Sequence, residues 1–189
     1  IPACGTRQQT DCKITDTVQI MSGDIQRKAH DEANAALVQR LCELSGPVIE
    51  WLCLHHRLNL TLVEGFLYPG HSVPRMHAPP SRAGADLLAD LSRAVSVADI
   101  PVMTQAHVTD LYANTHGGVT GTRIERPEGG VEYIGCEVLI LACNGFGGNA
   151  DMVQTHIPDM ADALYFGHQG NQGDAIVWGQ ALGAETRHL

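Results

Sequence analysis

The sequence has no apolar run that approaches the roughly 18 residues of a transmembrane helix, so it predicts no membrane span. Its start, Ile1 to Thr10, also lacks the charged and then apolar layout of a signal peptide. Basic side chains are scarce: 12 stand against 21 acidic ones, for a net charge of −9. This acidic balance argues against nucleic acid and anionic membrane surfaces as non-specific partners.

The six cysteines lack C-x-x-C spacing, which argues against a redox pair or a zinc ribbon. Cys42 and Cys53 fall in an apolar helical pattern and Cys143 follows an apolar run, where free cysteine packs as a small hydrophobe. This usage indicates a reducing compartment, most simply the cytoplasm. No carboxylate or thiolate joins the ten histidines at a metal-ligand spacing, so no metal site is predicted.

The length of 189 residues suits one domain, or one domain and part of another. Hydrophobic residues make up 44% and charged residues 17%, which is typical of a globular chain with a sizeable core. The chain has no initiator methionine, and we therefore expect it to begin inside a longer gene product.

The first half predicts helices over residues 24–55, after a short extended piece at 15–21 and with Ser22 as a candidate cap. Gly46 and Pro47 interrupt the apolar stripe, which predicts two helices rather than one. A strand is expected at 58–63, an irregular loop with four prolines at 64–83, and a helix at 85–98.

The second half changes to a period of two. It predicts a three-stranded antiparallel meander over 100–134, with turns at 114–118 and 127–130. The apolar run 138–142 is typical of a strand that is covered on both faces. A short helix is expected before Pro158, and another at 174–182. The sequence thus predicts an α/β fold.

Two glycine-rich segments carry the clearest functional signal. The first, 143–149, ends the apolar strand, and the second, 167–174, opens the last helix. Glycine lets a backbone approach a flat or charged ligand, and free N–H groups at a helix start attract anions. Alternatively, the first is a plain strand-to-helix turn and Asp174 merely caps its helix. Together they indicate one cofactor wall.

Several motifs carry a family resemblance. Leu139–Asn149 resembles V-I-L-A-x-G-G-F-x-x-N, Gly170–Ala175 resembles G-x-x-G-D-G, and Ala181–Ala184 resembles the A-x-x-x-G-A that follows it. Ala106–Leu111 and Gly118–Gly121 resemble the pattern T-x-V-x-x-L and G-x-V-x-G of a meander. The sequence is thereby similar to FAD-dependent oxidoreductases of the fumarate reductase/succinate dehydrogenase flavoprotein type, which include ketosteroid and tricarballylate dehydrogenases.

The resemblance covers about residues 83–189, with Asn144 and Ala175 each in place of a family glycine. It implies a partial FAD-binding two-dinucleotide-fold (Rossmann-like) domain. Residues 1–166 would form its central part, and residues 167–189 would lead into a substrate-capping domain. It also implies an opening G-x-G-x-x-G unit before residue 1 and catalytic residues after residue 189, so no catalytic residue is assigned. The implied FAD contacts are His107, Val108, Ala142, Cys143, Asn144, Gly145, Gln169, Gly173 and Asp174.

The function implied is transfer of hydride or electrons between FAD and a C–C bond beside a carbonyl or carboxylate. The substrate would be an organic acid or a steroid-like enone, and this chain alone would be inactive. A ketosteroid dehydrogenase-like flavoenzyme and a non-catalytic α/β binding domain remain alternatives. An NAD-linked dehydrogenase is disfavoured because the chain has no G-x-G-x-x-G. Without its first strand, the fragment would expose an edge and self-associate.

Overall fold

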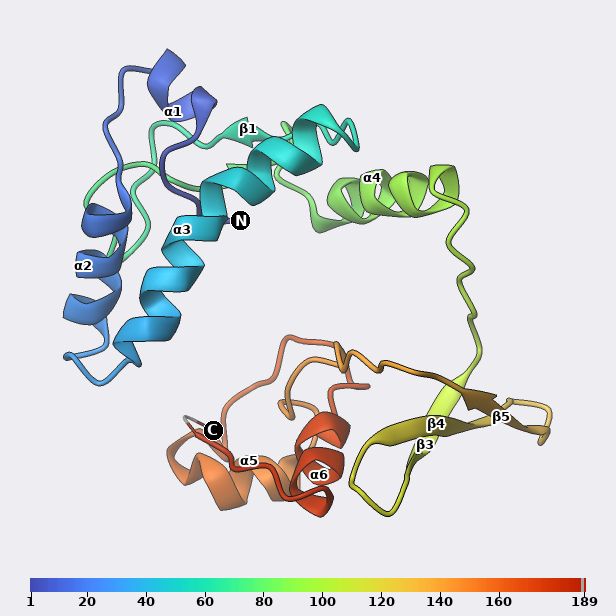
Figure 1. The fold of residues 1–189 in the computed structure, drawn as a ribbon. Coiled ribbons are helices and arrows are strands. Elements are labelled where there is room, and N and C mark those ends of the chain that lie inside the picture. The colour runs from blue at the N-terminus through green and yellow to red at the C-terminus, as the bar shows by residue number, and fades with distance from the viewer. Residues whose placement is uncertain (188) are drawn as a thin grey trace. The chain divides into compact units, whose positions relative to one another are not determined.

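A computed structural model describes residues 1–187 and 189. The chain forms two compact units, Ile1–Val102 and Met103–Leu189, hereafter unit 1 and unit 2 (Figure 1). The boundary at residue 166, which came from the family resemblance, stays a prediction.

Unit 1 opens with two short helices, α1 (Arg7–Asp11) and α2 (Val18–Lys28). A capping box starts α1, formed by Thr6 and Gln9. The extended piece and the Ser22 cap were wrong predictions, because α2 begins earlier. The Thr17 side chain accepts a hydrogen bond from the Ile20 N–H at 3.2 Å and so sets the start of the helix.

Helix α3 (Ala35–Leu54) is continuous, so the expected break at residues 45–47 was also wrong. Pro47 lies inside the helix, where it costs one backbone hydrogen bond. Gly46 does not end a helix. Because it has no side chain, the N-terminal segment around Cys4 can pack closely against α3. A Cβ atom there would lie 2.4 Å from the Cys4 carbonyl oxygen. Tertiary packing therefore overrides the local stop signal.

The rest of unit 1 contains little regular structure. Strand β1 (Thr61–Leu62) pairs antiparallel with β2 (His77–Ala78), so the strand expected at 58–63 is shorter than predicted. The segment between them is irregular, as its prolines indicated. Helix α4 (Gly84–Val97) confirms the helix expected there.

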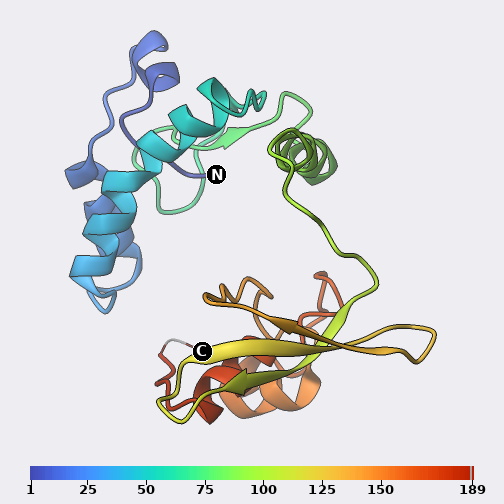
Figure 2. The ribbon, with the colours of Figure 1, turned by 45° about the vertical axis from the view of Figure 1, so that its right-hand side comes forward.

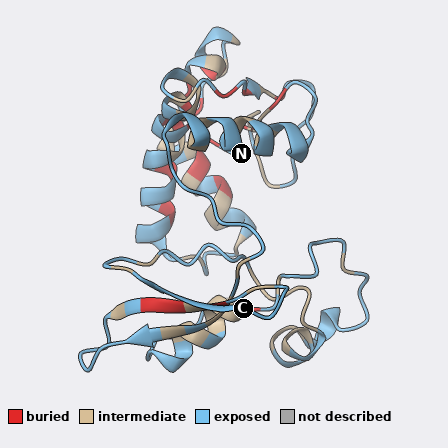
Figure 3. Cartoon of the chain, turned by 90° about the vertical axis from the view of Figure 1, so that its right-hand side faces the viewer, coloured by how far each residue is buried: buried red, intermediate tan, exposed pale blue. Residues whose placement is uncertain are grey.

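The core of unit 1 lies on two faces of α3. One cluster holds Ala3, Ile49, Leu58 and Leu60, and the other holds Cys4, Met21, Val38 and Cys42. Figure 3 shows that buried residues gather in this unit, whereas unit 2 has buried positions on one strand of its sheet. Unit 1 therefore has the larger hydrophobic core.

A buried ionic network joins the N-terminal helices to the loop before β2. The Arg75 guanidinium is 1% exposed and contacts two buried carboxylates, Asp16 through its Nε at 3.0 Å and Asp24 through its Nη1 at 2.8 Å. Gln9 donates to Asp16, and the Ser72 N–H donates to Asp24. These bonds satisfy charges that would otherwise be costly to bury.

Unit 1 should lose stability between about pH 4 and pH 2, because the pKa of Asp24 is lowered from 3.8 to about 2. Burial alone raises this pKa, but hydrogen bonds from Ser72 and Arg27 and the charge of Arg75 outweigh burial. Since the folded-state pKa is depressed, this contribution is present above the unfolded-state pKa and disappears as the pH falls towards 2. Urea midpoints of wild type and Asp24→Asn should therefore converge over this window; a constant difference would contradict the prediction.

Unit 2 contains the predicted meander. Strands β3 (His107–Ala113), β4 (Val119–Glu125) and β5 (Val131–Gly135) form an antiparallel sheet in that order. Figure 2 shows them side by side. Gly117 and Gly129 hold positive φ in the two turns, as their sequences indicated. Residues 100–103, predicted to begin the meander, form no strand.

The strand predicted at 138–142 was wrong. These residues are outside every helix and strand, and Val138 and Ile140 are 79% and 84% exposed. Within the described part of the chain, no backbone N–H or C=O from 138 to 142 has a backbone hydrogen-bond partner. A strand requires a ladder partner, so the apolar pattern alone cannot create one.

Three helical segments complete unit 2: α5 (Ala150–His156), the 3₁₀ turn η1 (Pro158–Met160) and α6 (Asp174–Ala181). They confirm the two predicted helices, and Gly183, at φ +88°, ends the second as expected. In the part of the chain that the structure describes, no helix is both long and apolar enough to cross a membrane.

Candidate functional site

The two glycine-rich segments are joined by backbone hydrogen bonds. The Gly173 N–H donates to the Gly145 carbonyl oxygen at 3.1 Å, and the Gly148 N–H donates to the Asn171 carbonyl oxygen at 2.9 Å. Side chains add to the contact, since the Asn149 amide donates to the Gln172 carbonyl oxygen at 3.0 Å. The two segments are therefore in direct contact, and their role as one cofactor wall stays a prediction.

Glycine is required where these segments meet. A Cβ atom at Gly148 would lie 2.7 Å from the Gln169 carbonyl oxygen. Gly173 has φ +84°, and a Cβ atom there would lie 2.4 Å from the Met152 sulfur. Close packing and left-handed backbone thus account for these two glycines without any ligand.

A cavity of about 380 Å³ lies in unit 2, between the sheet, the segment 139–143 and α6. Most of its lining is aliphatic or aromatic, and its polar groups come from few side chains. The lining residues are Ala106, His107, Val108, Leu111, Thr122, Leu139, Ile140, Leu141, Ala142, Cys143, Asp174 and Trp178. Apolar walls with a few polar groups are typical of small-molecule sites.

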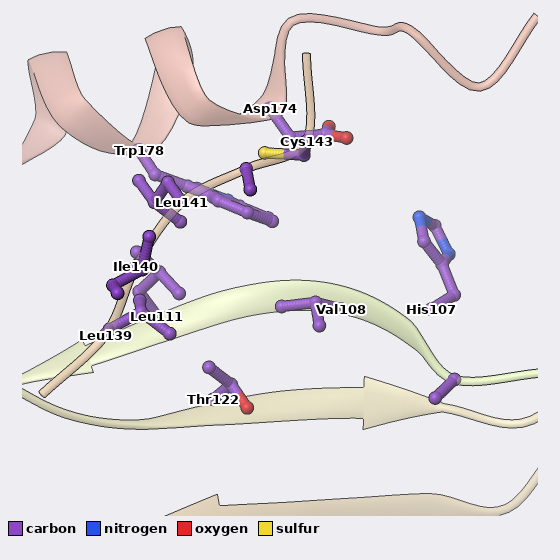
Figure 4. Close-up of a pocket in the computed structure, with 12 residues that line it drawn as sticks. His107, Val108, Leu111, Thr122, Leu139, Ile140, Leu141, Cys143, Asp174 and Trp178 are labelled. Atoms are coloured by element: carbon purple, nitrogen blue, oxygen red, sulfur yellow. The ribbon is translucent and has the colours of Figure 1, made fainter. Parts of the chain in front are cut away.

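The side chains labelled in Figure 4 come from strands β3 and β4, from the segment 139–143 and from helix α6. His107 and Val108 come from the start of β3, whereas Asp174 and Trp178 come from the first turns of α6. The Asp174 carboxylate lies beside Cys143, and the Trp178 indole extends along the segment 139–143. One end of the cavity is therefore polar and the other apolar.

Asp174 is the first residue of α6 and does not cap it. The N-cap is Gly173, and no side chain makes a capping hydrogen bond. Among the described residues, the Asp174 carboxylate has no hydrogen bond and no ion pair. The carboxylate is consequently available as an acceptor, and the helix start favours its negative charge.

The structure brings five of the nine predicted contact residues to this cavity: His107, Val108, Ala142, Cys143 and Asp174. The other four, Asn144, Gly145, Gln169 and Gly173, do not line it. Asn144 has φ +65° and its side chain accepts from the Gly145 N–H at 3.0 Å, which stabilises the turn. Their predicted cofactor contacts stay predictions.

Trp178 also lines the cavity, but it was not among the contacts that the family resemblance implies. It lies four positions after Asp174, and residues at that spacing share one face of a helix. That spacing is the signal that could have identified it. No group of three or more histidine, cysteine, aspartate or glutamate side chains with metal-binding geometry occurs in residues 1–187 and 189.

Curated proteins align with nearly the whole chain. A probable fumarate reductase of Shewanella frigidimarina is 26% identical over 189 residues, covering 99% of this chain and 32% of that protein. A urocanate reductase of Eggerthella lenta is 27% identical and covers 90% of this chain and 28% of that protein. The chain is related to fumarate reductase-type flavoproteins. It spans only 20–32% of the length of these two proteins and of a third curated relative, an NADH:fumarate oxidoreductase of Klebsiella pneumoniae.

Solved structures support the same relationship. A flavocytochrome c3 fumarate reductase in its open conformation has a TM-score of 0.87 at 25% identity, covering 98% of this chain and 33% of that one. A 3-ketosteroid-Δ4-(5α)-dehydrogenase from Rhodococcus jostii has a TM-score of 0.83 at 19% identity and indicates a shared fold. No family model matches the sequence. The chain therefore has the fold of the part, about a third, of the flavocytochrome c3 fumarate reductase that it matches.

Proposed function

We propose that this chain supplies part of the FAD site of a flavin-dependent oxidoreductase. The observation that carries the proposal is the cavity of unit 2, where a free carboxylate on a helix start faces an apolar slot. The similarity to flavoprotein fumarate reductases is the reason for assigning FAD to this cavity. Without that relationship, the cavity would indicate only a small-molecule site.

The residues present fit part of a dinucleotide. The cavity of about 380 Å³ falls at the lower end of the roughly 300–1,000 Å³ usual for ligand pockets. It would therefore take the adenosine part rather than the whole of FAD. Val108, Ile140 and Trp178 would pack against a flat ring, and the Asp174 carboxylate would accept a hydrogen bond from a hydroxyl group.

The reaction that we propose for the complete enzyme is reduction or oxidation of a C–C bond next to a carbonyl or carboxylate. A bound flavin would supply the hydride chemistry. In this chain, the aliphatic wall would exclude water and the polar end would orient the cofactor. A ketosteroid-type dehydrogenase is the second candidate, favoured by the shared fold.

Filling the cavity should abolish nucleotide binding. Ala142 is the last residue of the apolar run 138–142 and lines the cavity, so Ala142→Trp would fill with an indole the space that we assign to the adenosine part. We expect the chain to bind ADP weakly, and Ala142→Trp to weaken that binding at least tenfold. Asp174→Asn, which removes the charge and keeps the shape, should weaken it by about three- to tenfold, as expected for one charged hydrogen bond. Isothermal titration calorimetry measures both.

The matched control is Ala184→Trp, which makes the same change outside the cavity and should leave ADP affinity unchanged. A second measurement adds FAD to a longer protein that carries the flanking sequence of the relatives, and records its visible absorption. Absence of flavin bands there, together with equal ADP affinity of all variants, would overturn the proposal.

A further inference from the structure

Unit 1 contains a second cavity of about 380 Å³, which the proposed flavin site does not use. It lies between α2 and the loop that precedes β2, and every residue that lines it belongs to unit 1. Much of the wall is apolar, from Pro2, Met21, Ile25, Leu41 and Pro69. Its size and lining suit a small molecule with an apolar body.

Four charged side chains next to this cavity neutralise one another. Arg75 uses its Nε and Nη2 atoms on Asp16, at 3.0 and 3.1 Å, and its Nη1 atom on Asp24 at 2.8 Å. Asp24 also pairs with Arg27 and accepts from the Ser72 N–H and hydroxyl. Two arginines thus balance two carboxylates, and the charge of Arg75 is already compensated by the two aspartates that it contacts.

Lys28 is the charged residue of the cavity lining whose charge is not compensated by an ion pair among the described residues. It lines the cavity, is exposed, and forms no ion pair or side-chain hydrogen bond with the described residues. Its methylene groups lie against Gly70. A lysine held by its stem keeps its ammonium group free at the rim. The cavity therefore carries one net positive charge in a chain whose net charge is −9.

His71 supplies the second polar group. Its Nδ1 atom is buried and has no hydrogen-bond partner, although buried polar atoms are nearly always paired. Its backbone N–H donates to the Tyr68 carbonyl oxygen at 3.0 Å, which fixes the residue in the loop. Burial, and then the charge of Arg75, lower the pKa of His71, so the imidazole is neutral at pH 7. A neutral ring adds a hydrogen bond to the site but no second charge.

We propose that this cavity binds a monocarboxylate with an apolar body. Lys28 pairs with the carboxylate, the unpaired Nδ1 atom of His71 makes a hydrogen bond with the ligand, and the apolar wall covers the body. A dicarboxylate fits less well, because its second charge would meet Asp24 or the apolar wall instead of a free cation. The inference does not depend on the flavin site, since it uses residues of unit 1 alone.

The test is titration of the 189-residue chain with 3-phenylpropionate, followed by calorimetry at pH 7. A ligand of this size should bind with a Kd on the order of 0.1–1 mM. Succinate and the neutral 3-phenylpropanol should each bind at least tenfold more weakly. Lack of saturable binding, or equal affinity for succinate, would overturn the proposal.

Variants assign the contacts. Lys28→Gln should weaken 3-phenylpropionate binding at least tenfold, whereas Lys13→Gln, the same change at the only other lysine and outside the cavity, should leave it unchanged. His71→Phe keeps the ring but removes Nδ1 and should weaken binding at least fivefold, while His71→Asn keeps a polar atom there and should restore most of it. Circular dichroism checks that each variant is folded. Equal effects of the two lysine variants would refute the site.

Discussion

Replacing Arg75 with methionine should lower the free energy of unfolding of unit 1 more than any other single substitution of its charged residues. Both Asp16 and Asp24 are buried; among the described residues this guanidinium is the only cation that pairs with Asp16, and Asp24 pairs otherwise only with the exposed Arg27. Methionine fills a similar volume but leaves Asp16 without an ion-pair partner and Asp24 with Arg27 alone. Removing one partner of a buried ion pair costs about 3–5 kcal/mol, and we expect Arg75→Met to lower the free energy of unfolding by that amount. Urea denaturation followed by circular dichroism measures it.

Two further variants show whether burial is the cause. Arg40→Met removes a cation whose pair with Glu43, at 3.4 Å, lies on the surface. Exposed pairs contribute only about 0–1 kcal/mol, so this change should have little effect. Adding Asp16→Asn to Arg75→Met removes one stranded charge and should restore part of the loss. If Arg75→Met proved no worse than Arg40→Met, the network would have no stabilising role.

Replacing Gly46 with alanine should destabilise unit 1 even though alanine favours helices. The added methyl group would lie 2.4 Å from the Cys4 carbonyl oxygen and 3.5 Å from the Cys4 carbonyl carbon. Both are backbone atoms, and the Cys4 N–H is held by the Ser45 hydroxyl at 3.1 Å, so the segment has little freedom to move. Overpacking of this kind costs about 1–3 kcal/mol. We expect Gly46→Ala to lower the free energy of unfolding by about 2 kcal/mol, measured by urea denaturation.

Gly23→Ala is the matched control. Gly23 lies inside α2, and a Cβ atom there would have no neighbour within 4 Å. Alanine in a helix interior is more stable than glycine by about 0.5–1 kcal/mol, so this variant should gain stability. The two glycine variants should therefore have opposite signs. Equal gains in both would mean that α3 does not pack closely on the N-terminal segment.

The sequence by itself determined those helices and strands whose local sequence pattern and tertiary packing favour the same structure. Alternation and turn residues predicted the three strands of the meander, and Gly183 marked the end of α6. The two glycine-rich segments could also be identified, because glycine occurs where backbone must come close. Motif resemblance then gave the flavoprotein relationship, which the alignments support.

Only the tertiary structure decided what depends on a distant partner. Gly46 and Pro47 indicate a helix end, yet α3 continues through them. Close packing against the Cys4 backbone leaves no room for a side chain at position 46 and so favours glycine inside this helix. The apolar run 138–142 signals a strand, yet no described strand pairs with it. Likewise, no spacing could show that Arg75 serves two carboxylates, 59 and 51 positions earlier. Contacts between residues far apart in the sequence leave no local period, so they become visible only in the folded chain.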